Sequence, residues 1–186
     1  LEGEDAVRAF EEAVQRRGYY PFRTTPDELS ELASDEAKWH KLFDEHMIAT
    51  VERWMAMADE KLGGTGIRVF VCPGNDDQLE IDDIVAAAKT VELGEGRVVD
   101  INGFQLASSG WANRTPWDTY REEDEPVLGE RIERMLADVT APPERTIFSL
   151  HCPPYGTGLD DAPQLTKDMD LKDAGRSTVP CGSTAV

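Results

Sequence analysis

Two apolar stretches of the sequence each end at side chains that could bind a metal ion or move a proton. Residues 67–71 form a short, β-branched run that Pro73-Gly74 terminates, and residues 146–150 form a second such run. The side chains that follow the two runs are Asn75, Asp76, Asp77 and His151. Ligands of open α/β sheets bind beyond the carboxyl ends of the strands, so parallel neighbouring strands would bring these residues to one edge. Because amide, imidazole and carboxylate groups all bind transition metals, we expect a metal-centred hydrolytic site.

The two stretches resemble two sequence blocks of the calcineurin-like metallophosphoesterases. Gly74-Asn75-Asp76-Asp77 resembles that family's Gly-Asn-His-Asp/Glu block, and His151 followed by Pro153-Pro154 resembles its next, single-His block. The resemblance implies an α/β fold, a layered sandwich of helices and two sheets, here incomplete. It also implies hydrolysis of a phosphate mono- or diester by a water molecule that two divalent metal ions activate, with Mn, Fe or Zn as the candidates.

The resemblance also assigns roles to the four residues. Asn75 and His151 would be metal ligands, and Asp77 would orient its neighbour and support the ligands. Asp76 departs from the family, which has a histidine there that acts on the leaving oxygen or the substrate phosphate. An aspartate could donate a proton only if its pKa rose well above about 4, whereas nearby metal ions would lower that pKa. Asp76 therefore has another role, or it serves substrates with a good leaving group, such as aryl phosphates.

The family's other blocks are not found in the sequence. An opening Asp-x-His block and a Gly-Asp block would precede Asn75, and a closing Gly-His-x-His block would follow His151. The chain begins at Leu1 and stops after a Gly-Ser pair typical of a helix start, so we expect an internal fragment of a longer phosphoesterase. The fragment alone is expected to be inactive, because Asn75 and His151 cannot hold two metal ions. The alternative is a non-catalytic binding or scaffold module with a decayed site.

The composition of the chain argues against some classes of partner and indicates the cellular compartment. Its 186 residues include 37 Asp and Glu against 19 Lys and Arg, a formal net charge of −18. This charge argues against general nucleic-acid binding and against binding to a membrane surface, since both require basic patches. No apolar run approaches the ~20 residues of a membrane-spanning helix, no signal-like segment is seen, and three separated cysteines do not suggest disulfides. We therefore expect a cytoplasmic protein whose partner is a phosphate-ester small molecule or a phosphodiester.

Residues 1–66 are expected to be a helical insertion within a single phosphoesterase domain, of which residues 1–186 are a part. Helical periodicity begins near Ala6, and the segment from Thr25 to Glu28 has the N-cap, proline and acidic residues of a helix start. The strongest pattern is one apolar stripe from Trp39 to Leu62, which predicts a long helix. We expect this stripe to be buried against the sheet or against a second copy in a homo-oligomer.

The rest of the chain predicts strands and helices around the candidate site. A short helix is expected over residues 81–88, and a hairpin of strands 98–101 and 104–108 turns at Asn102-Gly103. A further helix is expected over residues 127–139. Residues 156–181 show little periodicity.

A few other residues have chemistry that the site does not require. Cys72 and Cys152 are expected to be buried structural thiols. His151 is not expected to activate Cys152 as a nucleophile, because adjacent residues of a strand point to opposite faces. His46 is expected to pack in the long helix and His40 to lie on the surface. The aromatic loop over residues 110–121 is either a substrate lid or a hydrophobic plug.

Overall fold

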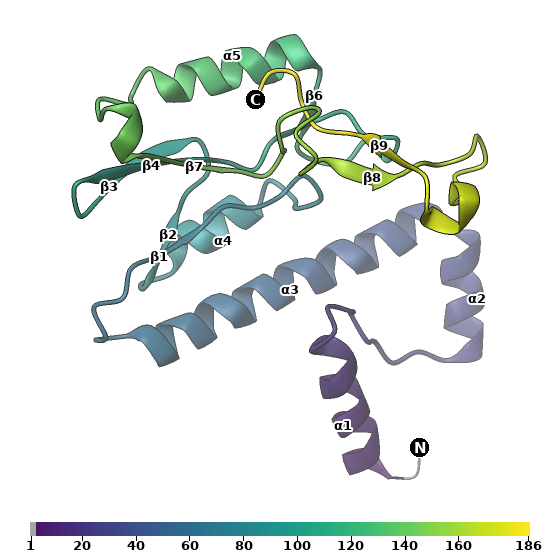
Figure 1. The fold of residues 1–186 in the computed structure, drawn as a ribbon. Helices are drawn as coiled ribbons and strands as arrows, with labels where there is room; N and C mark the ends of the chain where they lie inside the picture. The colour runs from purple at the N-terminus through teal and green to yellow at the C-terminus, as the bar shows by residue number, and fades with distance from the viewer. Residues whose placement is uncertain (1–2) are drawn as a thin grey trace. The chain divides into compact units, whose positions relative to one another are not determined.

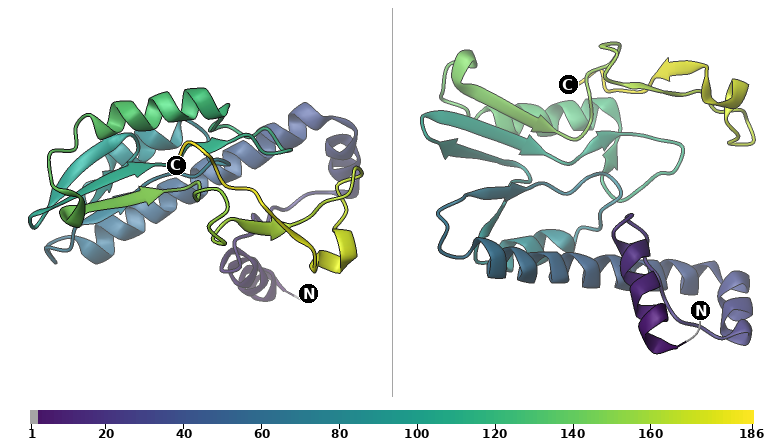
Figure 2. Two further views of the ribbon diagram at one scale, coloured as in Figure 1. Left: turned by 45° about the horizontal axis from the view of Figure 1, so that its top comes forward. Right: turned by 60° about the horizontal axis from the view of Figure 1, so that its bottom comes forward.

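A computed structural model describes residues 3–186 of the chain and divides it into two compact units, Leu1–Met57 and Ala58–Val186. The described residues form five α-helices and four small β-sheets, which confirms a mixed α/β class (Figures 1 and 2). The helices are α1 (Glu4–Gln15), α2 (Pro26–Ser34), α3 (Glu36–Leu62), α4 (Ile81–Ala87) and α5 (Glu125–Leu136). The strands are β1 (Val69–Val71), β2 (Val91–Leu93), β3 (Arg97–Ile101), β4 (Phe104–Ser109), β5 (Ala112–Asn113), β6 (Glu122–Glu123), β7 (Thr146–Leu150), β8 (Asp161–Pro163) and β9 (Thr178–Pro180). Short 3-10 helices span Pro143–Arg145 and Lys172–Gly175.

The first unit is helical, as expected. Thr25 caps α2 through a capping box, in which its hydroxyl accepts from the Glu28 N–H and Glu28 accepts from the Thr25 N–H. The turn between α1 and α2 packs aromatic rings on α3, with Phe22 lying 6.1 Å from Trp39 and 6.0 Å from His46 between ring centroids. The prediction that His46 is a packing residue is therefore confirmed.

The long apolar stripe of α3 is only partly buried. Met47, Val51 and Met55 are buried, which confirms one apolar face at helical spacing. The aromatic residues of the stripe are much more exposed, with Trp39 at 45%, Phe43 at 36% and Trp54 at 49%. Burial of these aromatic residues, against the sheet or against a second copy, stays a prediction.

In the second unit, helices α4 and α5 each cover part of a sheet. Helix α4 packs beside β2, and Ile81, Val85 and Val91 are buried there. Helix α5 lies over the sheet of β3, β4 and β7 and buries Leu128 and Ile132 (Figure 1). Each such side chain contributes about 1.5–3 kcal/mol by leaving water.

The sheets are shorter and more numerous than the two sheets expected. Strand β1 pairs with β2 in parallel, whereas β7 pairs in parallel with β4, and β4 pairs antiparallel with β3. The β3–β4 hairpin turns at Asn102 and Gly103, whose φ angles of 50° and 88° confirm the expected turn. Strand β8 pairs with β9 within residues 156–181, whose sequence shows little periodicity. The sequence pattern missed these two strands because each has three residues and contains a proline.

Strands β1 and β7 are not neighbours, so the expectation that two adjacent parallel strands bring Asn75 and His151 to one edge is wrong. The segment that follows β2 lies between them, since the Gly94 N–H donates to the Val71 carbonyl and Glu95 bridges to Ser108 of β4. The His151 N–H then donates to the Ser109 carbonyl at 2.9 Å. The order in space from β1 to His151 therefore passes through the end of β2 and through β4.

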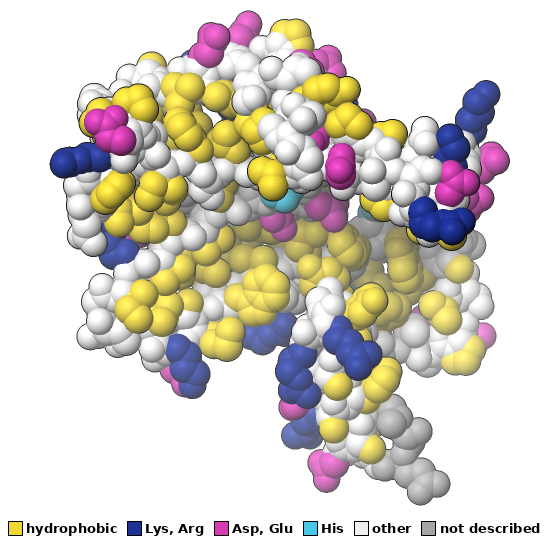
Figure 3. Space-filling view, viewed as in Figure 1, with side chains coloured by type: hydrophobic (Ala, Val, Ile, Leu, Met, Phe, Trp, Pro, Cys, Tyr) yellow, Lys and Arg dark blue, Asp and Glu magenta, His cyan; other side chains and the backbone are white. Residues whose placement is uncertain are grey.

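The outer strand of this sheet borders an apolar groove. Strand β7 lies at the edge of the sheet, and its Ile147 and Phe148 are 47% and 54% exposed. A groove of about 510 Å³ lies between β7, α5 and the last residues of the chain, and hydrophobic side chains gather on this face (Figure 3). His151 lines one end of the groove.

Among residues 3–186, none of the helices combines the length and the apolar character that crossing a bilayer requires.

Candidate functional site

Asn75 and His151 lie side by side although 76 residues separate them in the sequence. Asn75 Oδ1 and His151 Nε2 are 2.9 Å apart. Two ligand atoms bound to one metal at about 2.1 Å and at a right angle would be about 3 Å apart. At this distance the two side chains are hydrogen-bonded, with the imidazole Nε2 donating to the amide oxygen, and two ligands of a single metal ion can have the same spacing.

Glycines make this approach sterically feasible. A Cβ on Gly74 would lie 2.7 Å from Cε1 of His151, so only glycine leaves room for the imidazole above this turn. A Cβ on Gly110 would lie 1.6 Å from the Pro73 carbonyl oxygen, so the chain beyond β4 touches the chain beyond β1 directly. These two contacts place the Asn75 turn against His151 and against the chain beyond β4, where the Ser109 carbonyl accepts from the His151 N–H.

Hydrogen bonds within the turn and hydrogen bonds from Arg121 both stabilise the turn that carries Asn75. The Asp77 carboxylate accepts from the Gly74 N–H at 2.6 Å, and the Asp77 N–H donates to the Gly74 carbonyl at 3.1 Å. Asp77 therefore closes the turn that carries Asn75. From outside, the Arg121 N–H donates to the Asn75 carbonyl, and the buried Arg121 guanidinium donates to the Asp77 and Gln78 carbonyls and to the Asp82 carboxylate.

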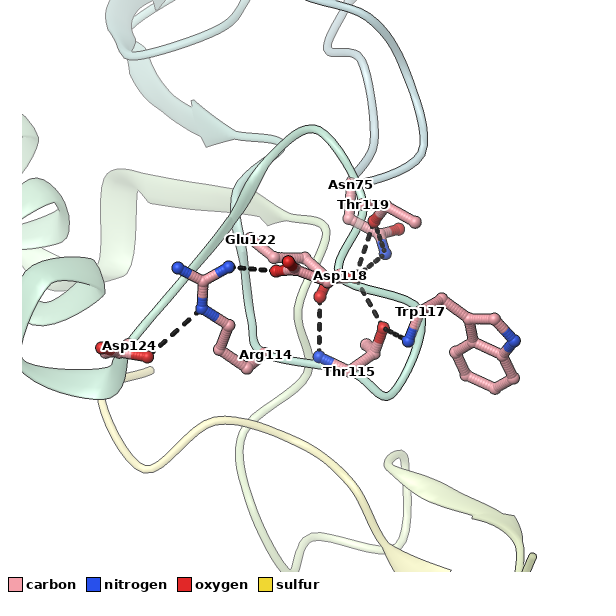
Figure 4. Close-up of polar contacts among 8 residues, drawn as sticks. All are labelled: Asn75, Arg114, Thr115, Trp117, Asp118, Thr119, Glu122 and Asp124. Atoms are coloured by element: carbon pink, nitrogen blue, oxygen red, sulfur yellow. Dashed lines mark hydrogen bonds and ion pairs between the residues drawn. The ribbon is translucent and has the colours of Figure 1, made fainter. Parts of the chain in front are cut away.

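A buried carboxylate holds the far side of the Asn75 amide (Figure 4). Asn75 Nδ2 donates to Glu122 Oε1 at 2.9 Å and to the Thr119 hydroxyl at 3.0 Å. Glu122 is 4% exposed and also accepts from the Thr119 hydroxyl, the Thr115 hydroxyl and the Thr115 N–H. Burial alone would raise the pKa of Glu122, but these hydrogen bonds outweigh it and lower the pKa to about 2.

Asp76 lies beside the pair and faces solvent in part. Its pKa is raised, first by burial and then by the negative charges of Asp77 and Glu122. The side chain is nonetheless exposed. Asp76 is thus the carboxyl group of the site whose surroundings favour the protonated form.

The described residues provide only part of a metal site. Among residues 3–186 there is no group of three or more His, Cys, Asp or Glu side chains placed to hold a metal ion. Asn75 and His151 fit two ligand positions of one ion, and a second ion would need ligands other than these two.

Neither cysteine near the site is activated as a nucleophile. Cys152 is 3% exposed and its thiol donates to Asn113 Oδ1 at 2.9 Å, while burial raises its pKa. Burial and then the charge of Glu95 raise the pKa of Cys72 strongly. The prediction of a buried structural thiol is confirmed for Cys152, whereas Cys72 is only half-buried.

The aromatic loop does not act as a hydrophobic plug at its tip. Trp117 is 65% and Tyr120 is 42% exposed. The Trp117 indole points away from the polar contacts between Asn75 and Glu122 (Figure 4). The polar residues of the loop are the ones that reach the site. Whether the loop covers a substrate stays a prediction.

Sequence reasoning missed Glu122, Thr119 and Arg121. Their contacts with Asn75 and Asp77 span 44 to 47 residues, and no short spacing in the sequence links them. The only local signal was the run of polar residues between the aromatic ones in the loop. That run has no periodicity from which a contact could be predicted.

Comparisons with known proteins leave the family open. No protein-family model matches the chain, and no curated protein matches it significantly. A solved structure matches with a TM-score of 0.47 and 16% sequence identity, covering 100% of this chain and 63% of the other. The chain thus spans less than two thirds of that structure, and a likeness of this degree identifies neither fold nor family.

Proposed function

We propose that this chain carries part of the active centre of a metal-dependent phosphoesterase, which hydrolyses phosphate mono- or diesters. The observation that supports the proposal best is the 2.9 Å contact between Asn75 Oδ1 and His151 Nε2. These atoms belong to the two segments that resemble calcineurin-like metallophosphoesterases, and they converge although their strands are not neighbours. Gly74, the first residue of the same block, is the residue that makes room for His151.

Asn75 and His151 would hold a divalent metal ion, with Mn, Fe or Zn as candidates from the resemblance. A pair of such ions supplies Lewis-acid chemistry, which lowers the pKa of water and neutralises phosphate charge. Asp77 would keep the Asn75 turn closed, and Asp76 would face the leaving group. The proposal implies the layered sandwich of that family, in which α5 over the β3–β4–β7 sheet would form one side.

Hydrolysis of an aryl phosphate tests this proposal. The longest natural chain that contains these residues is expected to hydrolyse an aryl phosphate in the presence of Mn²⁺. His151→Ala should lower that rate by about a hundredfold, because loss of a ligand disturbs the metal. His40→Ala is the matched control and should leave the rate unchanged. The 186-residue chain alone should be inactive, since its described residues do not provide ligands for two ions.

Metal-independent turnover, or full activity in His151→Ala, would contradict the proposal. Turnover by the 186-residue chain that depends on both Mn²⁺ and His151 would show that the ligand count is wrong. Absence of activity in the longest natural chain would favour the alternative, a binding or scaffold module with a decayed site.

Asp76→His is expected to raise turnover of an alkyl phosphate by about tenfold or more in the longest natural chain, without loss of metal. An imidazole has a pKa near neutral pH and donates protons to poor leaving groups better than a carboxyl group does. The rate on an aryl phosphate, which needs little protonation, is the internal control. An unchanged or lower rate on the alkyl phosphate would show that Asp76 does not replace the family's acid.

A further inference from the structure

We propose that Glu122 is a positioning residue that fixes the Asn75 amide with Oδ1 toward His151 and Nδ2 away from it. The inference rests on the proposed function, in which Asn75 Oδ1 is a metal ligand. It adds a residue that lies outside both motif blocks, on a strand 47 residues further along the chain.

The Asn75 amide nitrogen donates to two acceptors that lie on the same side of it. Nδ2 is 2.9 Å from Glu122 Oε1 and 3.0 Å from the Thr119 hydroxyl. The Thr119 hydroxyl donates its own proton to Glu122 Oε1 at 2.6 Å. The amide of Asn75 is therefore left with its oxygen alone for the side that faces His151.

Charge fixes the direction of these bonds. An ionised carboxylate can only accept hydrogen bonds, and Glu122 is 4% exposed, so water cannot replace a lost donor. A half-turn of the Asn75 amide would set its oxygen against the Glu122 carboxylate and leave two buried acceptors in contact. The reversed amide would also present its NH₂ group to the site, where it could not bind a metal ion.

The same argument explains why residue 75 is an asparagine. An aspartate would offer a metal ion more negative charge, but its second oxygen would lie against Glu122 Oε1, where Asn75 now donates at 2.9 Å. Two carboxylates at that distance in a buried place repel each other strongly. Glu122 thus selects a neutral ligand at position 75.

A double-mutant cycle in the metal-free chain tests the positioning role. Asn75→Asp should destabilise the fold, and adding Glu122→Gln should restore part of the loss, because the glutamine NH₂ can donate to the new carboxylate. We expect the unfolding constant of Asn75→Asp to fall by about tenfold or more when Glu122→Gln is added. Glu123→Gln is the matched control, since Glu123 pairs with Arg131 and should not rescue.

A zinc titration followed by NMR tests the consequence for the ligand. Glu122→Gln should weaken the response of the His151 ring and the Asn75 amide to Zn²⁺ by about ten- to a hundredfold. Equal zinc affinity in wild type and Glu122→Gln, or additive effects in the cycle, would overturn the positioning role. If Asn75→Asp does not fold, a folded double variant is itself the rescue, and failure of both to fold overturns the inference. A wild-type chain that ignores Zn²⁺ would instead count against the proposed function, while the cycle would still decide the role of Glu122.

Discussion

Arg121→Met is expected to lower the free energy of unfolding by about 3–5 kcal/mol, because it removes a buried guanidinium that pairs with the half-buried Asp82 carboxylate and donates to two backbone carbonyls. Arg121 is fully buried, and its guanidinium donates to Asp82 Oδ1 at 2.9 Å and to the carbonyls of Asp77 and Gln78 at 2.9 and 2.7 Å. Methionine fills much of the volume but leaves these three acceptors without their donor. Urea denaturation followed by circular dichroism measures the loss.

The matched control is Arg114→Met. Arg114 is exposed and pairs with the exposed carboxylates of Asp118 and Asp124, so its removal should cost less than about 1 kcal/mol. Equal losses in the two variants would show that Arg121 does not hold the Asn75 turn as its contacts indicate.

Gly110→Ala is expected to cost about 3 kcal/mol or more, since the added methyl group cannot be accommodated by a side-chain movement. Its Cβ would lie 1.6 Å from the Pro73 carbonyl oxygen and 2.7 Å from the Pro73 carbonyl carbon, so the backbone itself must shift. That shift would separate the Asn75 turn from the His151 segment. The expected result is a lower urea midpoint together with loss of the contact between these two side chains.

Gly129→Ala provides the comparison for this change. A Cβ there would meet only the Ala185 Cβ, at 3.7 Å, and Gly129 lies inside α5. Alanine should stabilise the helix by up to about 1 kcal/mol. A Gly110→Ala variant as stable as this one would refute the close approach of the two strand ends.

The sequence predicted the local structure around the site well where its signals are local. The capping residues of α2, the Asn102-Gly103 hairpin and the apolar face of α5 all depend on residues within a few positions of each other. Asn75 and His151 were paired because each follows a short apolar run, and the two side chains do meet.

The contacts that hold the site could not be predicted in the same way. Arg121 lies on the loop before β6, and Glu122 lies on this two-residue strand. In the sequence of the loop, the aromatic residues are a plainer pattern than the polar ones. The hydrogen bonds of Glu122 and Arg121 depend on the approach of segments more than 40 residues apart. Tertiary contacts of this kind leave no periodic pattern in a single sequence.

The central claim is that Asn75 Oδ1 and His151 Nε2 are ligands of one metal ion. Zinc titration of the isotope-labelled 186-residue chain, followed by NMR of the histidine rings and asparagine side-chain amides, tests it most directly. The account predicts that the signals of His151 and Asn75 shift together, saturate with one affinity, and respond less in Asn75→Ala. His40 and His46 serve as internal references and should not follow the same curve. Zinc binding that leaves His151 and Asn75 unchanged, or a His151 response unaffected by Asn75→Ala, would contradict it.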